Sequence, residues 1–408
     1  MKRRRQSTSL RSSQKPQGAP KTLSRFDSGR WSLVHVAFAL PPAEEPRVGR
    51  HYVLPFLVVA IVSLGSIVVA VSIDQPDVLR SQPGLKLALS RDWNTIWQFL
   101  VTFPLLIAFL LTERSLIPQR LSDLMKAGIL RFEVDTEDHL VKKWSYRFTA
   151  TNIIAQAVGI AVGLIVANAN YGEVRQPDWG SWQAKAGVMH VGGWVWLFWV
   201  GAFYWVVSLY FLRALTTIWF LFGITRDRDI ELVPFHPDNC GGLRPIGTIG
   251  LRNQYILAVG GVNVFLFGLV AYYLNLDELV GLLLAAGLLY ILGGPIAFLG
   301  PLFPFQSAMK KEKHQILQII GNALGSRYSQ AVKEIADKGM PQQSFAEIER
   351  LRKILATARR LPVWPFDIVT LRKFLAAYVG PPLLLIASTA LTKAVEQLVD
   401  RWSGTLGR

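Results

Sequence analysis

The residues with the clearest chemical potential lie close together in one short segment. His236, Asp238 and Cys240 fall within five residues of one another, and Gly241 and Gly242 follow directly. Imidazole, carboxylate and thiolate groups are usual zinc ligands, and an imidazole beside a carboxylate can transfer protons. Adjacent glycines can also form a nest of backbone N–H groups that binds an anion. We favour a tight turn between helices, because one local cluster with two prolines rarely supplies three or four tetrahedral ligands.

A second motif precedes the last apolar stretch of the chain. Trp364, Phe366 and Asp367 belong to the run Trp-Pro-Phe-Asp. Tryptophan and phenylalanine suit the headgroup region of a bilayer, and Asp367 can cap the helix that follows. We interpret this motif as an interfacial elbow at which the chain enters the membrane.

The two motifs resemble those of a group of uncharacterised bacterial multi-pass membrane proteins, which pair an HPDxxGGL loop with a WPFD elbow. The resemblance covers residues 230–392, and the N-terminal half is similar only in hydropathy. It implies an α-helical inner-membrane protein with a cytoplasmic helical segment, and it implies no activity. The positions that match the loop motif are His236, Asp238, Gly241 and Gly242.

Glycine and proline interrupt two apolar stretches. Gly293, Gly294 and Pro295, followed by Gly300, Pro301 and Pro304, lie in one, and Pro381 with Pro382 in another. A proline inside a helix frees a backbone carbonyl, which transporters and channels use to bind ions. A kinked structural helix uses the same residues. We expect helix breaks at both places, and they are the best argument in the sequence for transport.

The elements that must carry these residues are membrane-spanning helices. Hydrophobic residues make up 51% of the 408, and seven stretches of at least 19 residues carry no charge. About 20 apolar residues in a helix cross the hydrocarbon core. The sequence therefore predicts an all-α polytopic transmembrane bundle of about seven spans, at residues 51–73, 93–112, 148–169, 186–212, 254–274, 279–303 and 374–392.

The distribution of basic residues predicts how the chain is threaded. Of the 44 Lys and Arg residues, 36 lie in four segments, 1–50, 113–147, 213–252 and 304–373. The positive-inside rule places these segments in the cytoplasm, so we expect the N-terminus inside the cell and the C-terminus outside. This topology explains the net charge of +16 without a nucleic-acid partner. The double proline leaves open a re-entrant last stretch, with the tail in the cytoplasm.

The predicted organisation has four parts. Residues 1–50 form a basic segment that we expect to be disordered and able to contact anionic lipids. Residues 51–303 form the membrane domain, in which 113–147 should make short amphipathic helices beneath the bilayer. Residues 304–373 should form a helical hairpin, with Ser344 and Glu347 as a capping box. Residues 374–408 hold the last apolar span and the tail.

The spans themselves contain two further patterns. Small residues repeat every four positions in the third span, which predicts close approach by another helix, at Thr151, Ala155, Gly159, Gly163 and Ala167. Aromatic residues crowd the fourth span, where lipid-facing bulk is the favoured explanation and an aromatic ligand cleft the alternative. No carboxylate lies within a span, so no acid marks a buried site, and we expect Arg213 to snorkel to the surface.

Three classes of function remain. The first is a non-enzymatic sensor or scaffold component of the cell inner membrane, whose 304–373 segment meets a protein partner or another copy of the chain. The second is a channel or facilitator that uses the Gly/Pro-broken sixth and seventh helices. The third is a membrane enzyme with His236 and Asp238 as its acid/base or metal pair. No catalytic sequence motif supports the third class, so we predict no catalytic residue, metal or cofactor.

Overall fold

The computed structural model describes most of the chain between residues 50 and 383. The described residues are 50–74, 87–129, 134–176, 181–185, 187–227, 236, 238, 240–273, 280–338, 342–381 and 383. The expectations for the basic segment 1–49 and for the tail after residue 383 lie outside them. The crossing of the membrane by the predicted seventh span also lies largely outside them.

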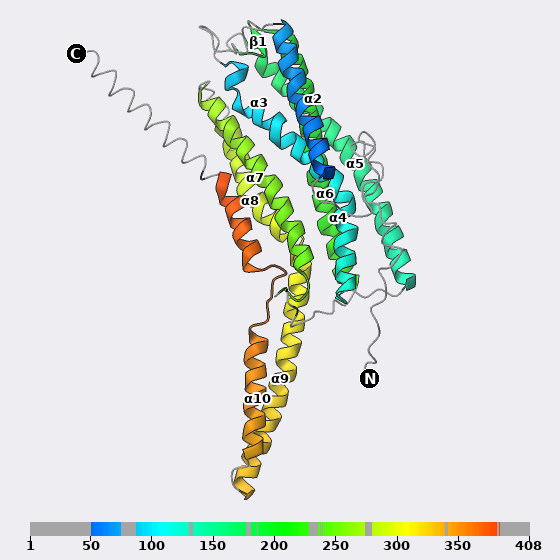
Figure 1. Cartoon of the computed structure of the whole chain (residues 1–408), viewed down its shortest axis with the longest axis vertical. Helices are drawn as coiled ribbons and strands as arrows, with labels where there is room; N and C mark the ends of the chain where they lie inside the picture. The colour runs from blue at the N-terminus through cyan, green and yellow to red at the C-terminus, as the bar shows by residue number, and fades with distance from the viewer. Residues whose placement is uncertain are drawn as a thin grey trace, which may run out of the picture.

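The predicted all-α fold is confirmed, since long helices make up nearly all of the described chain (Figure 1). The strands Ala184–Lys185 (β1) and Val188–Met189 (β2) pair as a small antiparallel hairpin before α6. The short helix η3 spans Leu89–Arg91. The longer elements are α2 (Arg50–Asp74), α3 (Trp93–Trp97), the π-helical η4 (Gln98–Thr102), α4 (Phe103–Lys126), α5 (Val134–Val174), α6 (Val191–Asp227), α7 (Arg244–Tyr273), α8 (Val280–Leu299), α9 (Phe303–Lys338), α10 (Gln342–Arg359) and a last helix over residues 368–381.

Five stretches within the described residues are long and apolar enough to cross a membrane, and α8 with α9 forms a sixth candidate that is bent by 50°. They correspond to the first five predicted spans and most of the sixth, although the fourth begins at Val191 and continues to Arg226, beyond its predicted end at residue 212. Segment 113–147 differs from its prediction. It supplies the end of α4 and the start of α5 rather than separate short helices, because the amphipathic patterns continue the helices that cross the membrane.

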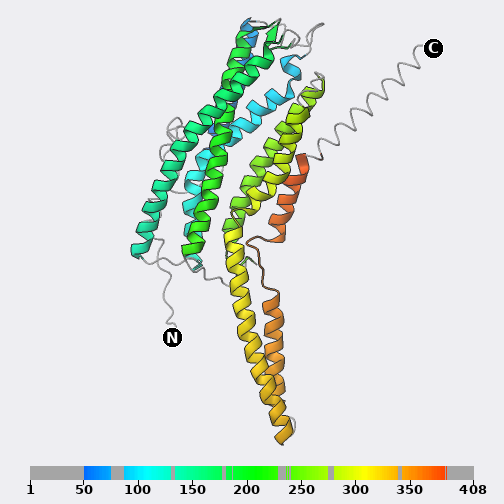
Figure 2. The same cartoon turned by 180° about the vertical axis from the view of Figure 1, so that it is seen from behind.

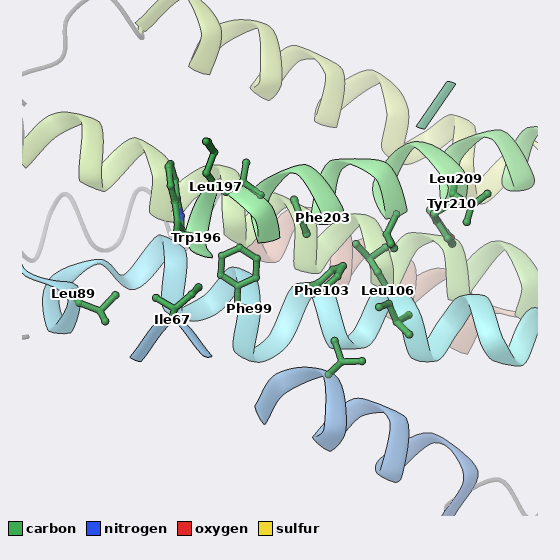
Figure 3. Close-up of a cluster of buried hydrophobic side chains, with 14 of the residues drawn as sticks. Ile67, Leu89, Phe99, Phe103, Leu106, Trp196, Leu197, Phe203, Leu209 and Tyr210 are labelled. Carbon is green, nitrogen blue, oxygen red and sulfur yellow. The ribbon is translucent and has the colours of Figure 1, made fainter. Parts of the chain in front are cut away.

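A buried apolar core holds α2, η4, α4 and α6 together. Phe99 and Phe103 face the aromatic side chains of α6, among them Phe203 (Figure 3). The ring centroids of Phe103 and Phe203 are 6.1 Å apart in an edge-to-face arrangement. Other aromatic residues of α6 are exposed, with Phe198 68% accessible. The crowded aromatic residues thus serve both helix packing and the outer face of the bundle.

The predicted close approach along the small-residue stripe is confirmed between α5 and α6. A Cβ atom added at Gly163 would overlap the carbonyl oxygen of Gly201, and one at Gly159 would lie 2.8 Å from the carbonyl oxygen of Trp205. Only a hydrogen atom fits at these positions, so the two backbones are in contact.

Helices α9 and α10 form the predicted hairpin, which projects away from the bundle in both views (Figures 1 and 2). The expected capping box is wrong. Ser344 lies inside α10, and its hydroxyl donates to Oε2 of Glu334 at 2.8 Å. Glu347 pairs instead with Arg327, at 3.3 Å. The two side chains therefore join α10 to α9, because partners on the neighbouring helix compete with the local cap.

Candidate functional site at the junction of the two motifs

Asp238 organises the HPDxxGGL loop. Its Oδ1 accepts hydrogen bonds from the backbone N–H groups of Cys240 and Gly242, both at 2.9 Å, and its Oδ2 accepts one from Arg244 at 3.3 Å. The Nδ1 atom of His236 lies 2.8 Å from Oδ1. Arg244 is the first residue of α7, so this carboxylate fixes the turn that starts the helix.

The two glycines of the loop are required by its conformation. Gly241 and Gly242 have φ angles of 65° and 86°, which other residues rarely adopt. A Cβ atom at Gly242 would also overlap the side chain of Ile129. The N–H group of Gly242 points at Asp238 rather than outward, so the chain's own carboxylate occupies the nest that an anion would need.

The pKa values of the Asp238 carboxyl and the Cys240 thiol are shifted in opposite directions. Burial opposes ionisation of Asp238, but the hydrogen bonds from Cys240, Gly242, His236 and Arg244 outweigh it and hold the pKa of the carboxyl below its ordinary value. Burial, with the nearby carboxylates of Asp238 and Asp367, raises the pKa of the Cys240 thiol to about 12. Cys240 is therefore a neutral thiol near pH 7, a poor nucleophile and metal ligand. Within the described residues, no cluster of three possible metal ligands is found.

The WPFD elbow packs against the same end of α7. As predicted, Asp367 caps the helix 368–381, since its Oδ1 accepts from the backbone N–H of Thr370 at 2.8 Å. A Cβ atom added at Gly247 would lie 2.7 Å from the carbonyl oxygen of Pro365. The structure therefore brings the two motifs together, although more than 100 residues separate them in the chain.

The first turns of α9 complete this junction. The Nζ atom of Lys313 donates to the carbonyl oxygens of Arg359 and Leu361, both at 2.7 Å. A hollow of about 280 Å³, counting the part open to solvent, lies between Gly241, Lys313 and Pro362. The loop, the elbow and the foot of the hairpin form one packed unit, which we name the junction.

The expected interruption falls in the second half of the predicted run, at Gly300 and Pro301. Helix α8 runs through Gly293, Gly294 and Pro295 to Leu299, and the bend follows at residues 300–302. Pro295 cannot donate to the carbonyl of Ile291, four residues earlier. The hydroxyl of Tyr378, from the last helix, donates to that carbonyl at 2.8 Å. This external donor satisfies the carbonyl that the proline leaves free, so the helix continues.

In the opposite direction, a tyrosine of α8 donates to carbonyl oxygens of the last helix. Pro381 cannot donate to the carbonyl of Ala377, four residues earlier. The hydroxyl of Tyr290, on α8, lies 3.3 Å from that oxygen and 2.8 Å from the carbonyl oxygen of Tyr378. The two tyrosine rings stack with centroids 5.8 Å apart. We call this reciprocal pair the tyrosine clasp, and it uses the carbonyls that an ion site at the broken helices would need.

A buried ion pair was missed by the sequence analysis. Nε of Arg213 on α6 lies 3.2 Å from Oε2 of Glu113 on α4, and the two side chains are 1% and 10% exposed. The hydroxyl of Thr217 donates to the other carboxylate oxygen at 3.3 Å. Arg213 therefore does not snorkel, and the expectation that no acid marks a buried site is wrong. The signal was present, since the chain carries no charge for twelve residues beyond Arg213 and so keeps that residue inside a span.

Polar groups of α7 extend this buried cluster. Arg252 donates to the carbonyl oxygen of Phe109 and to the hydroxyl of Thr112. The hydroxyl of Tyr210 donates to Asn253 at 2.9 Å. Gln254 is fully buried, and its amide has no partner within the described part of the chain. Ionisable groups inside a membrane bundle commonly mark functional sites, so this cluster joins the junction as a candidate.

The candidate residues of the sequence thus separate into two regions. The junction contains His236, Asp238, Gly241, Gly242, Trp364, Phe366 and Asp367, and the tyrosine clasp lies beside Gly294 and Pro295. The comparisons with protein families, with curated proteins and with solved structures gave no match.

Proposed function

We propose that this chain is a non-enzymatic scaffold or sensor component of the cell inner membrane, which presents the α9–α10 hairpin to a protein partner in the cytoplasm. The observation that carries the proposal is the hairpin itself. Helix α9 continues for 36 residues beyond the bend, and α10 packs back along it. Helix α8 alone supplies 20 residues, about the length that crosses a bilayer, so most of this extension is not needed for crossing and suits contact with another protein.

The end of the hairpin offers a surface for that contact. Tyr328, Val332 and Ile335 follow one face of α9 at intervals of four and three residues, and they are 59%, 55% and 41% exposed. The Arg327–Glu347 pair sets the register in which Phe345 of α10, 49% exposed, lies level with them. Large apolar side chains gathered on a water-exposed helix pair are typical of an interaction site.

The chemistry of the junction supports this class over an enzyme. Asp238 is occupied by backbone donors, and the pKa of Cys240 lies far above neutrality. In this chain the contact between Gly247 and Pro365 makes the loop and the elbow one structural unit. It also gives a reason for their pairing, because the unit anchors the hairpin to α7.

Site-directed cross-linking tests the hairpin surface. Cys240 is the single cysteine of the chain, and it is buried with a raised pKa, so an introduced thiol can be labelled selectively. Val332→Cys in native membranes, treated with a thiol-to-amine cross-linker, should give an adduct of one defined mass. Ser326→Cys is the matched control, because Ser326 is exposed on the opposite face of α9.

The same variants test the predicted orientation. A membrane-impermeant thiol reagent should label both cysteines only after the cells are opened. Equal cross-linking of the two positions, or none at Val332→Cys, would argue against the partner surface. Labelling in intact cells would place the hairpin outside and reverse the topology.

A second candidate function, a channel or facilitator, is favoured by the buried cluster. Glu113, Arg213 and the unpartnered amide of Gln254 are the kind of polar groups that line pathways through a membrane. The tyrosine clasp removes the broken-helix argument for it. Ion flux in reconstituted liposomes, lost on Glu113→Gln, would move this function to first place.

A further inference from the structure

Six exposed basic residues surround the foot of the hairpin. They lie on the second turn of α9, at the end of α10 and in the first turns of the last helix, and are Lys310, Lys311, Arg359, Arg360, Arg372 and Lys373. We name them the basic collar. Lys313 joins two of its parts, since it donates to the carbonyl oxygens of Arg359 and Leu361.

The third part is fixed by aromatic packing. Phe374, next to Lys373, stacks on Phe298 in the last turn of α8, with ring centroids 4.2 Å apart. Arg372 and Lys373 therefore lie level with the bend from which α9 starts. Figure 2 shows the elbow between α10 and the last helix beside this bend.

The charge of the collar is not neutralised within the described part of the chain, where none of the six side chains forms an ion pair. In the outer part of the hairpin, Arg327 pairs with Glu347 and Lys353 with Glu349, whereas Lys333 and Arg350 form no ion pair within the described residues. Positive charge thus gathers without partners at the end of the hairpin nearest the apolar bundle.

Aromatic side chains place the collar at headgroup depth. Phe303 is 45% exposed, its ring lies 6.0 Å from that of Trp364, and Trp364 contacts Phe366 at 5.5 Å. Aromatic groups of this kind prefer the interface between hydrocarbon and water. Lys310 follows Phe303 by seven residues, or about 10 Å along the helix. The collar is therefore within about one screening length of the phosphate layer.

We propose that the basic collar binds the headgroups of anionic phospholipids and so holds the hairpin at a fixed height and angle on the membrane. The occupant is a lipid because the aromatic groups supply a place for acyl chains directly below the charges. Basic residues near an anionic surface each strengthen binding severalfold. The positive-inside rule explains which side the charges occupy, but it does not require them to gather at the foot of the hairpin.

The test compares two variants of the full-length protein that lose the same charge. Arg359→Gln/Arg360→Gln changes the collar. Lys333→Gln/Arg350→Gln changes exposed basic residues farther out, and Lys333 lies about 45 Å along α9 from Phe303. Native mass spectrometry in a neutral detergent measures binding of phosphatidylglycerol and of phosphatidylcholine with the same acyl chains.

We expect the unmodified chain to bind phosphatidylglycerol about tenfold more tightly than phosphatidylcholine. The collar variant should lose most of that preference, while the outer variant stays within about twofold. Equal losses in the two variants would overturn the proposal, because charge alone would then matter. Loss in neither variant would also overturn it and would point to basic residues elsewhere. If glycerol 3-phosphate at the same concentration displaces phosphatidylglycerol, the ligand of the collar is a soluble phosphate and the lipid proposal is overturned.

Discussion

Two pairs of helices in the bundle pack closely through different contacts. In the first group, α5 and α6 touch through glycine, so that Gly163 meets the backbone of Gly201. In the second, α8 and the last helix touch through tyrosine, and each hydroxyl satisfies carbonyls that prolines of the other helix leave free. The first interface gains contact area between backbones, and the second gains hydrogen bonds.

Helix α6 of the first group also joins α4 through the buried ion pair of Arg213 with Glu113, whereas the tyrosine clasp is neutral. Loss of a buried charge and loss of a tyrosine hydroxyl should lower the free energy of unfolding by different amounts. Removing one member of a buried pair leaves an uncompensated charge, while removing a hydroxyl leaves one unsatisfied carbonyl. Substitutions in the two interfaces should therefore lower the stability of the protein by measurably different amounts.

The largest effect should come from breaking the ion pair. Glu113→Leu leaves Arg213 buried without its carboxylate and should destabilise the protein by about 3–5 kcal/mol. Thermal unfolding in detergent, followed by circular dichroism, measures the loss. Glu113→Leu/Arg213→Leu is the control, and it should recover most of the stability because an apolar pair replaces a charged one. A small effect of the single variant would mean that water reaches the pair.

Filling the glycine contact should have a smaller effect. Gly163→Ala forces α5 away from Gly201 and should cost about 1–3 kcal/mol, less the gain in helix propensity of about 1 kcal/mol. Gly172→Ala lies on the same helix, where an added Cβ meets nothing within 4 Å, and should be neutral or stabilising. The difference in melting temperature between the two variants isolates the contact. Equal values would show that α5 and α6 can separate freely.

The glycine stripe could be predicted from the sequence because its spacing is local. Spans were predictable for the same reason, since the length of an uncharged run decides them. Asp367 as a helix cap was also predictable, because Thr370, its partner, is three residues away. These features depend on neighbours along the chain.

The buried pair and the clasp could not be predicted in the same way. Glu113 and Arg213 are 100 residues apart, and their meeting depends on which helices are adjacent. Pro295 indicated a free carbonyl, but the donor from Tyr378 lies 87 residues from its acceptor. The capping box at Ser344 failed for a related reason, because Glu334 of α9 provides a competing acceptor.

The smallest effect should come from the tyrosine clasp. Tyr378→Phe removes the donor to the carbonyl of Ile291 and should cost about 1 kcal/mol. Tyr255→Phe, in which an exposed tyrosine of α7 loses its hydroxyl, is the control and should be neutral. The melting temperatures in detergent should therefore differ by only a few degrees.

A cycle with Pro295→Ala identifies the cause of that loss. Alanine at position 295 restores an N–H group that can donate to the Ile291 carbonyl within α8, so the hydroxyl of Tyr378 becomes dispensable. Tyr378→Phe should then cost almost nothing in the Pro295→Ala background. If the cost is the same in both backgrounds, the hydroxyl acts through ring packing with Tyr290 rather than through the carbonyl. In that case both helix interfaces would be stabilised by packing rather than by hydrogen bonds, and the distinction between the two groups would fail.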